Sequence, residues 1–267
     1  MFFYCMFVTI INDCRDQNAF GRQATRAAAL FNAPVATIGV EFDELEASGH
    51  LIDMLDASLG EEGVVLVNVA PRHGRGKKWP NGTPFGYFYV DKTLIVSSID
   101  GLTLSLVKKF GLTDTIQLLD IPDVTSAMVK QKVLTPPERD AIIHTQFRSY
   151  VFVPRVAAWI KKGLTVPSTP YSIQEVMDIP QVIWMIDSFG NCKTTLLSRD
   201  VQFIVGKPLR TNFGDITCYN RLKDVPNDEA GLIVGSSGYG DNRFLEVVAQ
   251  GKSAAKRFEL TVGSPLF

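Results

Sequence analysis

The stretch Gly63-Val64-Val65-Leu66-Val67-Asn68-Val69-Ala70 decides the fold class of this chain. Its apolar residues follow one another with little interruption and include several β-branched side chains. A continuous apolar run of this kind is typical of a strand that is buried on both faces of a parallel sheet. Parallel strands need crossover connections, which are usually helices, so the neighbouring segments should alternate between strand and helix.

The segments on either side show this alternation. Predicted strands span residues 7–11, 34–40, 87–89, 93–97 and 115–119, whereas helical spacing of apolar residues covers 22–31, 43–59, 102–110 and most of 137–163. We therefore expect an N-terminal layered α/β domain over residues 1–165.

The pattern changes after a Pro/Ser/Thr-rich segment at residues 164–170, which is typical of a domain boundary. Short predicted strands follow at residues 181–186, 193–197, 202–205, 215–219, 231–234, 244–248 and 257–262. With no long helix between them, these strands predict a small C-terminal all-β barrel or sandwich over residues 171–267.

The composition describes a globular protein. Of the 267 residues, 46% are hydrophobic and 21% are charged, and the formal net charge is −1. Such a charge gives no global attraction to nucleic acid or to anionic lipid. The apolar opening at residues 1–11 is too short to span a bilayer and is predicted to be a buried strand, so no membrane partner is expected.

The four cysteines are far apart in the sequence, and no two of them form a C-x-x-C pair. They match neither a zinc pattern nor a disulfide scaffold. We expect a cytoplasmic, reduced and metal-free protein.

A second informative segment follows the apolar run at residues 182–186. It places Asp187, Phe189 and Asn191 within five positions. A carboxylate can pair with an ammonium group, an aromatic ring can stack on a base, and an amide can contact a base edge. The alternative is a hairpin turn, in which Asp caps the turn and Gly190 supplies a positive φ.

Three further segments carry weaker signals. Asp13 follows the first strand, where it could accept the hydroxyls of a ribose or cap the next helix. The basic loop at residues 72–79 could bind an anion, but a solvated loop is commoner and a nucleic-acid partner is not expected. Residues 236–242 are Gly-rich and could form a turn or expose backbone N–H groups to a carboxylate.

Together these segments resemble the S-adenosylmethionine hydroxide adenosyltransferase family, which includes fluorinase-like and chlorinase-like enzymes. Residues 186–191 with Thr194 are similar to the family's Ile-Asp-x-Phe-Gly-Asn signature and its following Thr. Residues 236–239 resemble its Ser-Ser-Gly-Tyr motif, and residues 251–255 its Gly-x-Ser-Ala-Ala motif. Asn12-Asp13 and residues 98–102 match more weakly. The resemblance covers nearly the whole chain.

The resemblance implies a fold, an assembly and a set of roles. It implies a C-terminal β-barrel, a homotrimer and a nucleoside ligand held between domains of neighbouring subunits, with no cofactor besides S-adenosylmethionine as substrate or ligand. The implied ligand contacts are Asp13 with the ribose, Asp187 with the methionine ammonium, Phe189 and Asn191 with adenine, Tyr219 near adenine, and Ser237 with the amino-acid end.

The reacting half of the family's site differs here. Ala70 stands where the family hydrolases carry an Asp, Arg148 stands where they carry a His, and their Arg falls on Lys77 or Arg75. His73, whose imidazole suits proton transfer near neutral pH, is our candidate for the missing base, with Lys77 and Arg148 orienting the nucleophile.

Three functions remain open from the sequence. The first is hydrolysis of S-adenosylmethionine to adenosine and L-methionine. The second is binding of S-adenosylmethionine or adenosine with weak or no catalysis. The third is adenosyl transfer to a different nucleophile or from a different adenosyl substrate, including a nucleic-acid-linked one that the basic loop at residues 72–78 suggests.

Overall fold

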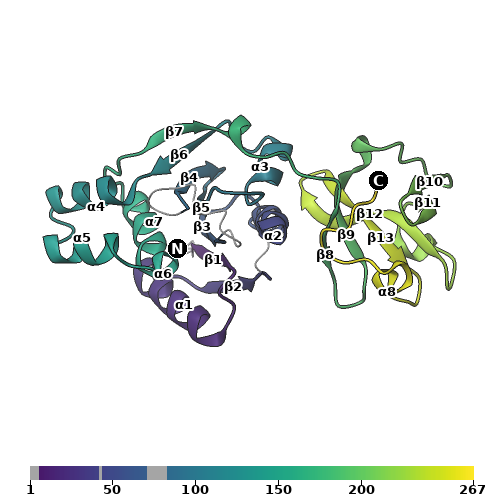
Figure 1. The fold of residues 1–267 in the computed structure, drawn as a ribbon, viewed down its shortest axis with the longest axis horizontal. Helices are drawn as coiled ribbons and strands as arrows, with labels where there is room; N and C mark the ends of the chain where they lie inside the picture. The colour runs from purple at the N-terminus through teal and green to yellow at the C-terminus, as the bar shows by residue number, and fades with distance from the viewer. Residues whose placement is uncertain (1–5, 42–43, 71–82) are drawn as a thin grey trace, which may run out of the picture. The chain divides into compact units, whose positions relative to one another are not determined.

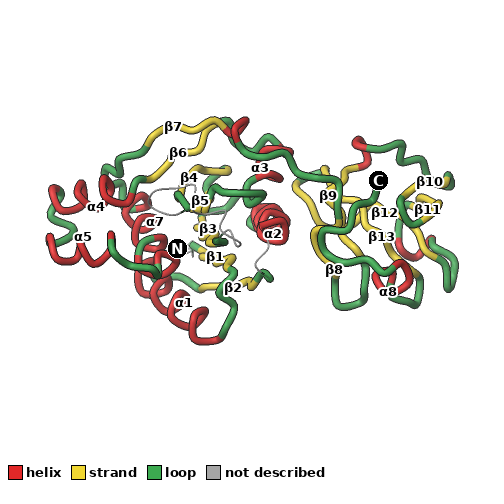
Figure 2. Tube along the Cα trace, in the orientation of Figure 1, coloured by secondary structure: helices red, strands yellow, loops and turns green. Residues whose placement is uncertain are grey.

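The computed structural model describes residues 6–41, 44–70 and 83–267. The chain divides into two compact units, Met1–Met177 and Asp178–Phe267. Each unit contains one multi-stranded sheet, and most of the helices belong to the first unit (Figures 1 and 2). The prediction of a mixed α/β protein is therefore confirmed.

The first unit begins with a strand and continues with alternating strands and helices. Its elements are β1 (Phe7–Asn12), α1 (Gln17–Phe31), β2 (Val35–Gly39), α2 (Glu44–Ala57), β3 (Gly63–Asn68), β4 (Phe85–Val90), β5 (Thr93–Ser98), α3 (Ser105–Phe110), β6 (Thr115–Leu119), α4 (Ile121–Lys130), α5 (Pro136–Ile143), α6 (Arg148–Val151), α7 (Val153–Lys161), β7 (Thr169–Ser172) and the 3₁₀ turn η2 (Ile173–Glu175).

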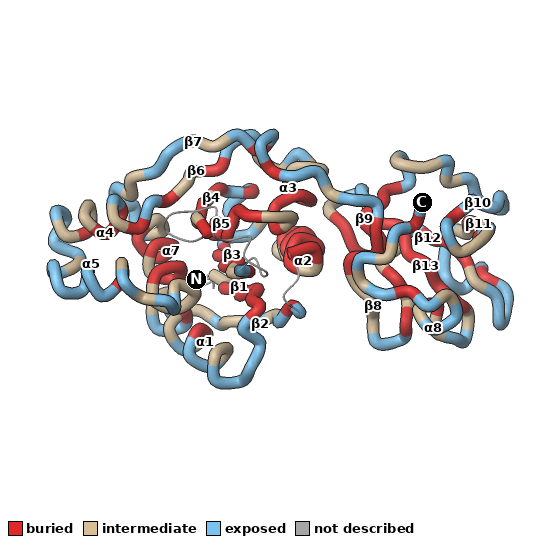
Figure 3. The backbone as a smooth tube through the Cα atoms, viewed as in Figure 1, coloured by how far each residue is buried: buried red, intermediate tan, exposed pale blue. Residues whose placement is uncertain are grey.

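Seven strands form the sheet of this unit in the order β2-β1-β3-β5-β4-β6-β7. Strands β2, β1, β3 and β5 are parallel, whereas β4, β6 and β7 are antiparallel to their neighbours. The strand β5 is buried along its whole length and β3 along nearly all of it, as the apolar run at residues 63–70 predicts (Figure 3).

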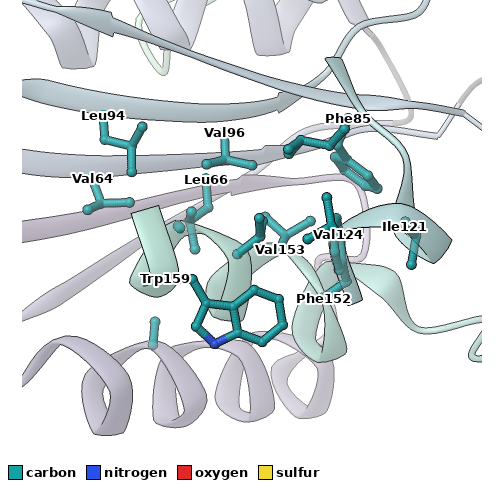
Figure 4. Packing of buried hydrophobic residues seen from close by; sticks show 14 of the residues in the cluster. Val64, Leu66, Phe85, Leu94, Val96, Ile121, Val124, Phe152, Val153 and Trp159 are labelled. Atoms are coloured by element: carbon teal, nitrogen blue, oxygen red, sulfur yellow. The ribbon is translucent and has the colours of Figure 1, made fainter. Parts of the chain in front are cut away.

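Helices cover both faces of the sheet. Helix α1 packs on β1 and β2, and α7 packs on β3 and β5, whereas α2 contacts β1 and β3 and also packs on α3. Figure 4 shows the close contact of strand side chains with α7, where Trp159 and Val153 lie below Leu66 and Val96 in the view. Burial of these apolar side chains is the main stabilising term for such a layered unit.

The first unit extends beyond the predicted boundary because the Pro/Ser/Thr segment contains a strand. Strand β7 pairs with β6 at the edge of the sheet, where Pro170 is tolerated since an edge strand leaves some N–H groups unpaired. Lys108 then donates hydrogen bonds to the carbonyls of Gln174 (3.1 Å) and Val176 (2.8 Å). The compact units divide at residue 177, whereas the sequence pattern placed the boundary at 165–171.

The second unit is built mainly of strands. Its elements are β8 (Ile183–Ile186), β9 (Cys192–Leu197), η3 (Ser198–Asp200), β10 (Pro208–Thr211), β11 (Gly214–Tyr219), η4 (Leu222–Asp224), β12 (Ala230–Tyr239), β13 (Asn242–Ala249) and helix α8 (Ala254–Phe258). The strand order is β10-β11-β12-β13-β9-β8.

The predicted barrel is not confirmed. No ladder joins the edge strands β8 and β10 in the described part of the unit. Instead, Leu266 near the C-terminus donates to the carbonyl of Gln181 (3.2 Å) and accepts from Asn212 (2.9 Å). The C-terminal segment 263–266 therefore lies between the two edges, with hydrogen bonds to Gln181 and Ile183 on one side and to Asn212 on the other.

Two predicted strands of this unit are wrong. Residues 202–205 form turns, and the strand of this region is β10. The segment at 257–262 is not a strand either, because Arg257 and Phe258 form the end of helix α8. This helix begins where the Ser253 side chain accepts from Lys256 N–H (3.2 Å). The helix ends at Glu259, whose φ of 53° is left-handed. Helix α4 was also missed, although Asp120 caps it and Pro122 lies in its first turn.

Candidate functional site

The carboxyl ends of β1 and β3 carry a buried polar cluster. The side-chain oxygen of Asn12 accepts hydrogen bonds from Asn68 Nδ2 (3.0 Å) and from the backbone N–H of Cys14 (3.2 Å). The other side-chain atom of Asn12, Nδ2, has no hydrogen-bond partner among the described residues, although Asn12 is fully buried. An unsatisfied buried donor costs about 1–3 kcal/mol, and this amide group can still donate a hydrogen bond.

Asp13 lies in the same cluster and is almost fully buried, at 1% exposure. Its Oδ2 accepts from the backbone N–H of Ala70 (3.1 Å), and its own N–H donates to Asn68 (3.3 Å). The cap of α1 is Asp16, whose side chain accepts from Ala19 N–H (2.9 Å), so the capping alternative for Asp13 is wrong. A ribose would reach the Asp13 carboxylate only after this side chain became exposed.

Two further acidic residues, Glu44 of α2 and Asp100, lie near the end of β5, which neighbours β3. Leu102 N–H donates to Glu44 Oε2 (3.1 Å), and both Glu44 and Asp100 are buried. Gly101 has a φ of 63°, and a Cβ at this position would lie 1.7 Å from Glu44 Oε2. The close approach of the carboxylate to the backbone therefore requires glycine.

Arg148 lies at the same end of the sheet, where the parallel strands finish. Its Nη1 donates to the carbonyl of Thr83 (3.1 Å), and its guanidinium lies 5.7 Å from the ring centroid of Phe85. Phe85 pairs with Ser98 because β4 runs antiparallel to β5, which brings the start of β4 to the carboxyl ends of the parallel strands. Burial lowers the pKa of Arg148. A pocket of about 300 Å³ adjoins Arg148 and is lined by Ile121, Pro122, Ile143, Thr145 and Gln146.

The structure thus brings Asp13 and Arg148 to the end of the first sheet where the parallel strands finish. The other two predicted catalytic residues, His73 and Lys77, lie outside the described residues.

The segment from Asp187 to Asn191 forms the turn between β8 and β9. Asp187 Oδ1 accepts from the N–H groups of Phe189 and Asn191 (both 2.9 Å), and its Oδ2 accepts from Asn191 Nδ2 (2.9 Å). The turn interpretation is therefore correct. A carboxylate has about four acceptor positions, so a fourth donor, such as an ammonium group, could still bind.

The turn is held against the start of α8. Ala255 N–H donates to the carbonyl of Gly190 (2.9 Å), and a Cβ on Gly190 would lie 2.0 Å from Ser253 Oγ. This contact leaves Phe189 pointing into solvent at 79% exposure. A rigid turn that exposes a large aromatic ring is suited to stacking on a flat ligand.

A pocket of about 520 Å³ lies beside this ring. It is lined by Phe189, Asn191, Leu222, Ala249, Gln250, Gly251, Lys252 and Ser253. The volume falls within the range of small-molecule sites, and the lining combines apolar walls with a few polar groups. Asn191 Oδ1 accepts no hydrogen bond from a described residue and is therefore available to a ligand.

The other three predicted residues of the second unit, Asp187, Tyr219 and Ser237, are not among the residues that line this pocket. Tyr219 packs with Val225, Ile233 and Val248. Ser237 is buried, and its hydroxyl accepts a short hydrogen bond from Lys193 Nζ. Lys193, which the sequence motifs did not single out, also lies over the Trp184 ring at 5.8 Å.

The cysteine next to the turn is not a nucleophile near neutral pH. Burial, aided by the negative charge of Asp187, raises the pKa of Cys192 to about 12. Its thiol faces the carbonyl of Gly190 at 3.8 Å. The thiol therefore stays protonated and acts as a small apolar group of the core.

No group of three or more His, Cys, Asp or Glu side chains among the described residues is placed to hold a metal ion. Within the same ranges, none of the helices has the length and apolar character needed to cross a membrane.

Comparison with known proteins gives matches among solved structures only. No protein-family model matches the chain, and no curated protein matches it. An uncharacterized conserved protein from Thermotoga maritima matches with a TM-score of 0.67 and 18% identity, over 96% of this chain and 97% of that one. A conserved hypothetical protein from Thermus thermophilus matches with a TM-score of 0.62 and 21% identity, over 96% and 97% of the two chains. At these identities the likeness shows a shared fold.

Proposed function

We propose that this protein binds S-adenosylmethionine and hydrolyses it to adenosine and L-methionine by attack of water or hydroxide at C5′. The observation that carries the proposal is the pocket of about 520 Å³ beside the Asp187–Asn191 turn, with its exposed aromatic ring and available amide oxygen. The sequence of this turn is also the segment that most resembles the adenosyltransferase family.

Each group of the turn has a role in binding. The Phe189 ring would stack on adenine, and stacking of a base on an aromatic side chain contributes about 1–3 kcal/mol. Asn191 Oδ1 would accept a hydrogen bond from the adenine amino group. The Asp187 carboxylate would pair with the methionine ammonium, using the acceptor position that the turn leaves open.

Ser237 and Lys193 are the candidates for the carboxylate of the ligand. The Lys193 ammonium already donates to the Ser237 hydroxyl, so the two groups could bind a carboxylate oxygen together. Tyr219 is proposed to lie near adenine by resemblance alone.

For this reaction the protein mainly has to position the substrate and the attacking water. In a sulfonium, the C5′ carbon already carries a good leaving group, so an oriented and partly desolvated water can displace methionine. General-base help is worth about 10²–10⁴-fold, and His73 is the proposed base, with Lys77 and Arg148 orienting the nucleophile.

A second candidate function is binding without rapid turnover. Ala70 replaces the family's Asp, Asp13 is buried against the Ala70 N–H, and Arg148 is engaged by the Thr83 carbonyl. These three observations favour a protein that holds the nucleoside but reacts slowly. Adenosyl transfer to another nucleophile is the third possibility.

One experiment separates these functions. The purified protein is incubated with S-adenosylmethionine, products are followed by chromatography, and binding is measured by calorimetry on the same sample. Adenosine and methionine in equal amounts support hydrolysis, saturable binding without products supports the second candidate, and the absence of both rejects each of them.

The proposal includes a C-terminal β-barrel and a homotrimer, which the resemblance implies. It also includes a cytoplasmic location, which the cysteine pattern predicts. Light scattering coupled to size-exclusion chromatography tests the trimer, and a monomer mass would reject it.

A further inference from the structure

A basic pocket on the first unit has no part in the proposed adenosyl site. It measures about 590 Å³ and is lined by Gln17, Asn18, Gly21, Arg22, Thr25, Arg26, Ala29 and Tyr150. All but the last belong to α1, and no carboxylate is among the lining residues. We call these residues the α1 pocket.

The two arginines of the α1 pocket are held in place by Tyr150. Arg22 donates a short hydrogen bond to the Tyr150 hydroxyl, and its guanidinium lies 4.2 Å from the centroid of that ring. Arg26 lies 5.4 Å from the same centroid and donates to the Tyr150 carbonyl (3.5 Å). A guanidinium that stacks on a ring keeps its N–H edge available for an anion.

No acidic group neutralises these two arginines directly, since neither forms an ion pair with a described residue. Arg155 interacts electrostatically with Arg26 and with Glu138. Burial and the positive charge of Arg26 lower the pKa of Arg155, whereas Glu138 and Tyr150 act in the opposite direction. Gathering like charges destabilises the ligand-free protein, and an anion in the pocket would relieve that repulsion.

The donors of the α1 pocket suit a phosphate better than a carboxylate. Arg22 and Arg26 are four residues apart and therefore lie on one face of the helix, about 5–6 Å apart at Cβ. Two guanidinium groups, two side-chain amides and the Thr25 hydroxyl exceed what the two oxygens of a carboxylate can accept. A phosphate group presents three strong acceptor oxygens and a charge of about −1.5 to −2, which matches two arginines.

The size and surroundings of the pocket indicate that the ligand carries more than a phosphate. Open space surrounds Gly21, since a Cβ added there would meet nothing within 4 Å. Phe147, at 59% exposure, has its ring centroid 6.2 Å from that of Tyr150 and offers apolar surface at the edge of the site. We propose that the α1 pocket binds a phosphorylated small molecule, with Arg22 and Arg26 contacting the phosphate.

Calorimetry with inorganic tripolyphosphate tests this site, because the probe contains no nucleoside and does not report on the pocket at Phe189. We expect saturable binding that weakens as salt is added. The double variant Arg22→Gln/Arg26→Gln should bind at least about tenfold more weakly, since the charge-assisted hydrogen bonds to the phosphate are lost.

Two further variants make the test independent of lost packing. Thr25→Glu keeps both arginines and their contacts with Tyr150 but places a carboxylate in the pocket, so it should also weaken binding at least about tenfold. Arg210→Gln removes one positive charge from the second unit, where Arg210 pairs with Asp215 (3.1 Å), and should leave the affinity unchanged.

The proposal is overturned if tripolyphosphate does not bind, or if both pocket variants retain the original affinity. Single-stranded RNA that binds far more tightly than tripolyphosphate, with an affinity that rises with its length, would also overturn it in favour of a nucleic-acid site.

Discussion

The side chain of Asp187 holds Asn191 by two hydrogen bonds, one to its backbone N–H and one to its side-chain Nδ2, both at 2.9 Å. One carboxylate thus sets both the shape of the turn and the direction of the amide that faces the pocket. The same atoms serve the fold and the proposed site, so each role must be tested with a variant that spares the other.

We predict that Asp187→Ala and Asn191→Ala each abolish binding of S-adenosylmethionine. Asp187→Ala should also lower the free energy of unfolding by about 1–3 kcal/mol, because three hydrogen bonds of the turn are lost. Asp187→Asn keeps an acceptor for the backbone N–H groups but removes the charge, so it should lose affinity with a smaller loss of stability. Calorimetry and chemical denaturation measure the two effects. Unchanged affinity in both alanine variants would refute the pocket assignment.

Phe189→Ala should weaken ligand binding without destabilising the fold. The ring is largely exposed, so its removal should change the free energy of unfolding by less than about 0.5 kcal/mol. The loss of stacking should reduce affinity for S-adenosylmethionine by about 1–3 kcal/mol. Ile204→Ala, another exposed apolar side chain of the second unit, is the control and should leave affinity intact. Equal affinities in the two variants would exclude stacking on Phe189.

Gly190→Ala should destabilise the protein more than Gly206→Ala. Both glycines have left-handed φ values, 85° and 78°, so each substitution carries a backbone cost of about 1 kcal/mol. Only at Gly190 does the new Cβ collide with a neighbour, Ser253 Oγ, whereas nothing lies within 4 Å at Gly206. Chemical denaturation of both variants measures the difference. Equal destabilisation would show that the turn is not held against α8.

The raised pKa of Cys192 predicts resistance to alkylation in the folded protein. At pH 8, iodoacetamide should modify the exposed Cys14 and spare Cys192, with peptide mass spectrometry as the measurement. Burial of the Cys192 thiol also makes the stability of the fold depend on pH. Because the pKa rises from 9.0 to about 12 on folding, the protonated thiol stabilises the fold below pH 9, and this stabilisation is lost as the pH rises from 9 towards 12. Rapid native alkylation of Cys192 would contradict the prediction.

His73→Ala should lower the turnover of S-adenosylmethionine by about 10²–10⁴-fold while leaving its affinity nearly unchanged, if His73 is the base. His144→Ala is the matched control, since His144 is exposed at the C-terminal end of α5, where its Nδ1 lies 2.8 Å from the carbonyl of Asp140. Single-turnover kinetics and calorimetry separate the two quantities. Full activity in His73→Ala would dismiss its role as base.

Local patterns predicted much of the fold. The apolar run that contains β3 and the helical spacing of α2 depend on neighbours in sequence, and both elements lie close to their predicted positions. Strand β7 could not be predicted from its own residues, because Thr169–Ser172 becomes a strand only by pairing with β6. The interpretation of residues 257–262 failed for a different reason, since the cap at Ser253 was overlooked.

The same distinction between local and long-range contacts applies to the candidate site. The Asp187–Asn191 turn could be predicted from the sequence by itself, because the donors and acceptors of its three side-chain hydrogen bonds all lie within five residues of one another. Only the tertiary structure decided that Asp13 is buried, that Asn12 meets Asn68, and that Arg22 stacks on Tyr150. These contacts join segments far apart in the chain, so they depend on strand register and helix packing that no local pattern contains.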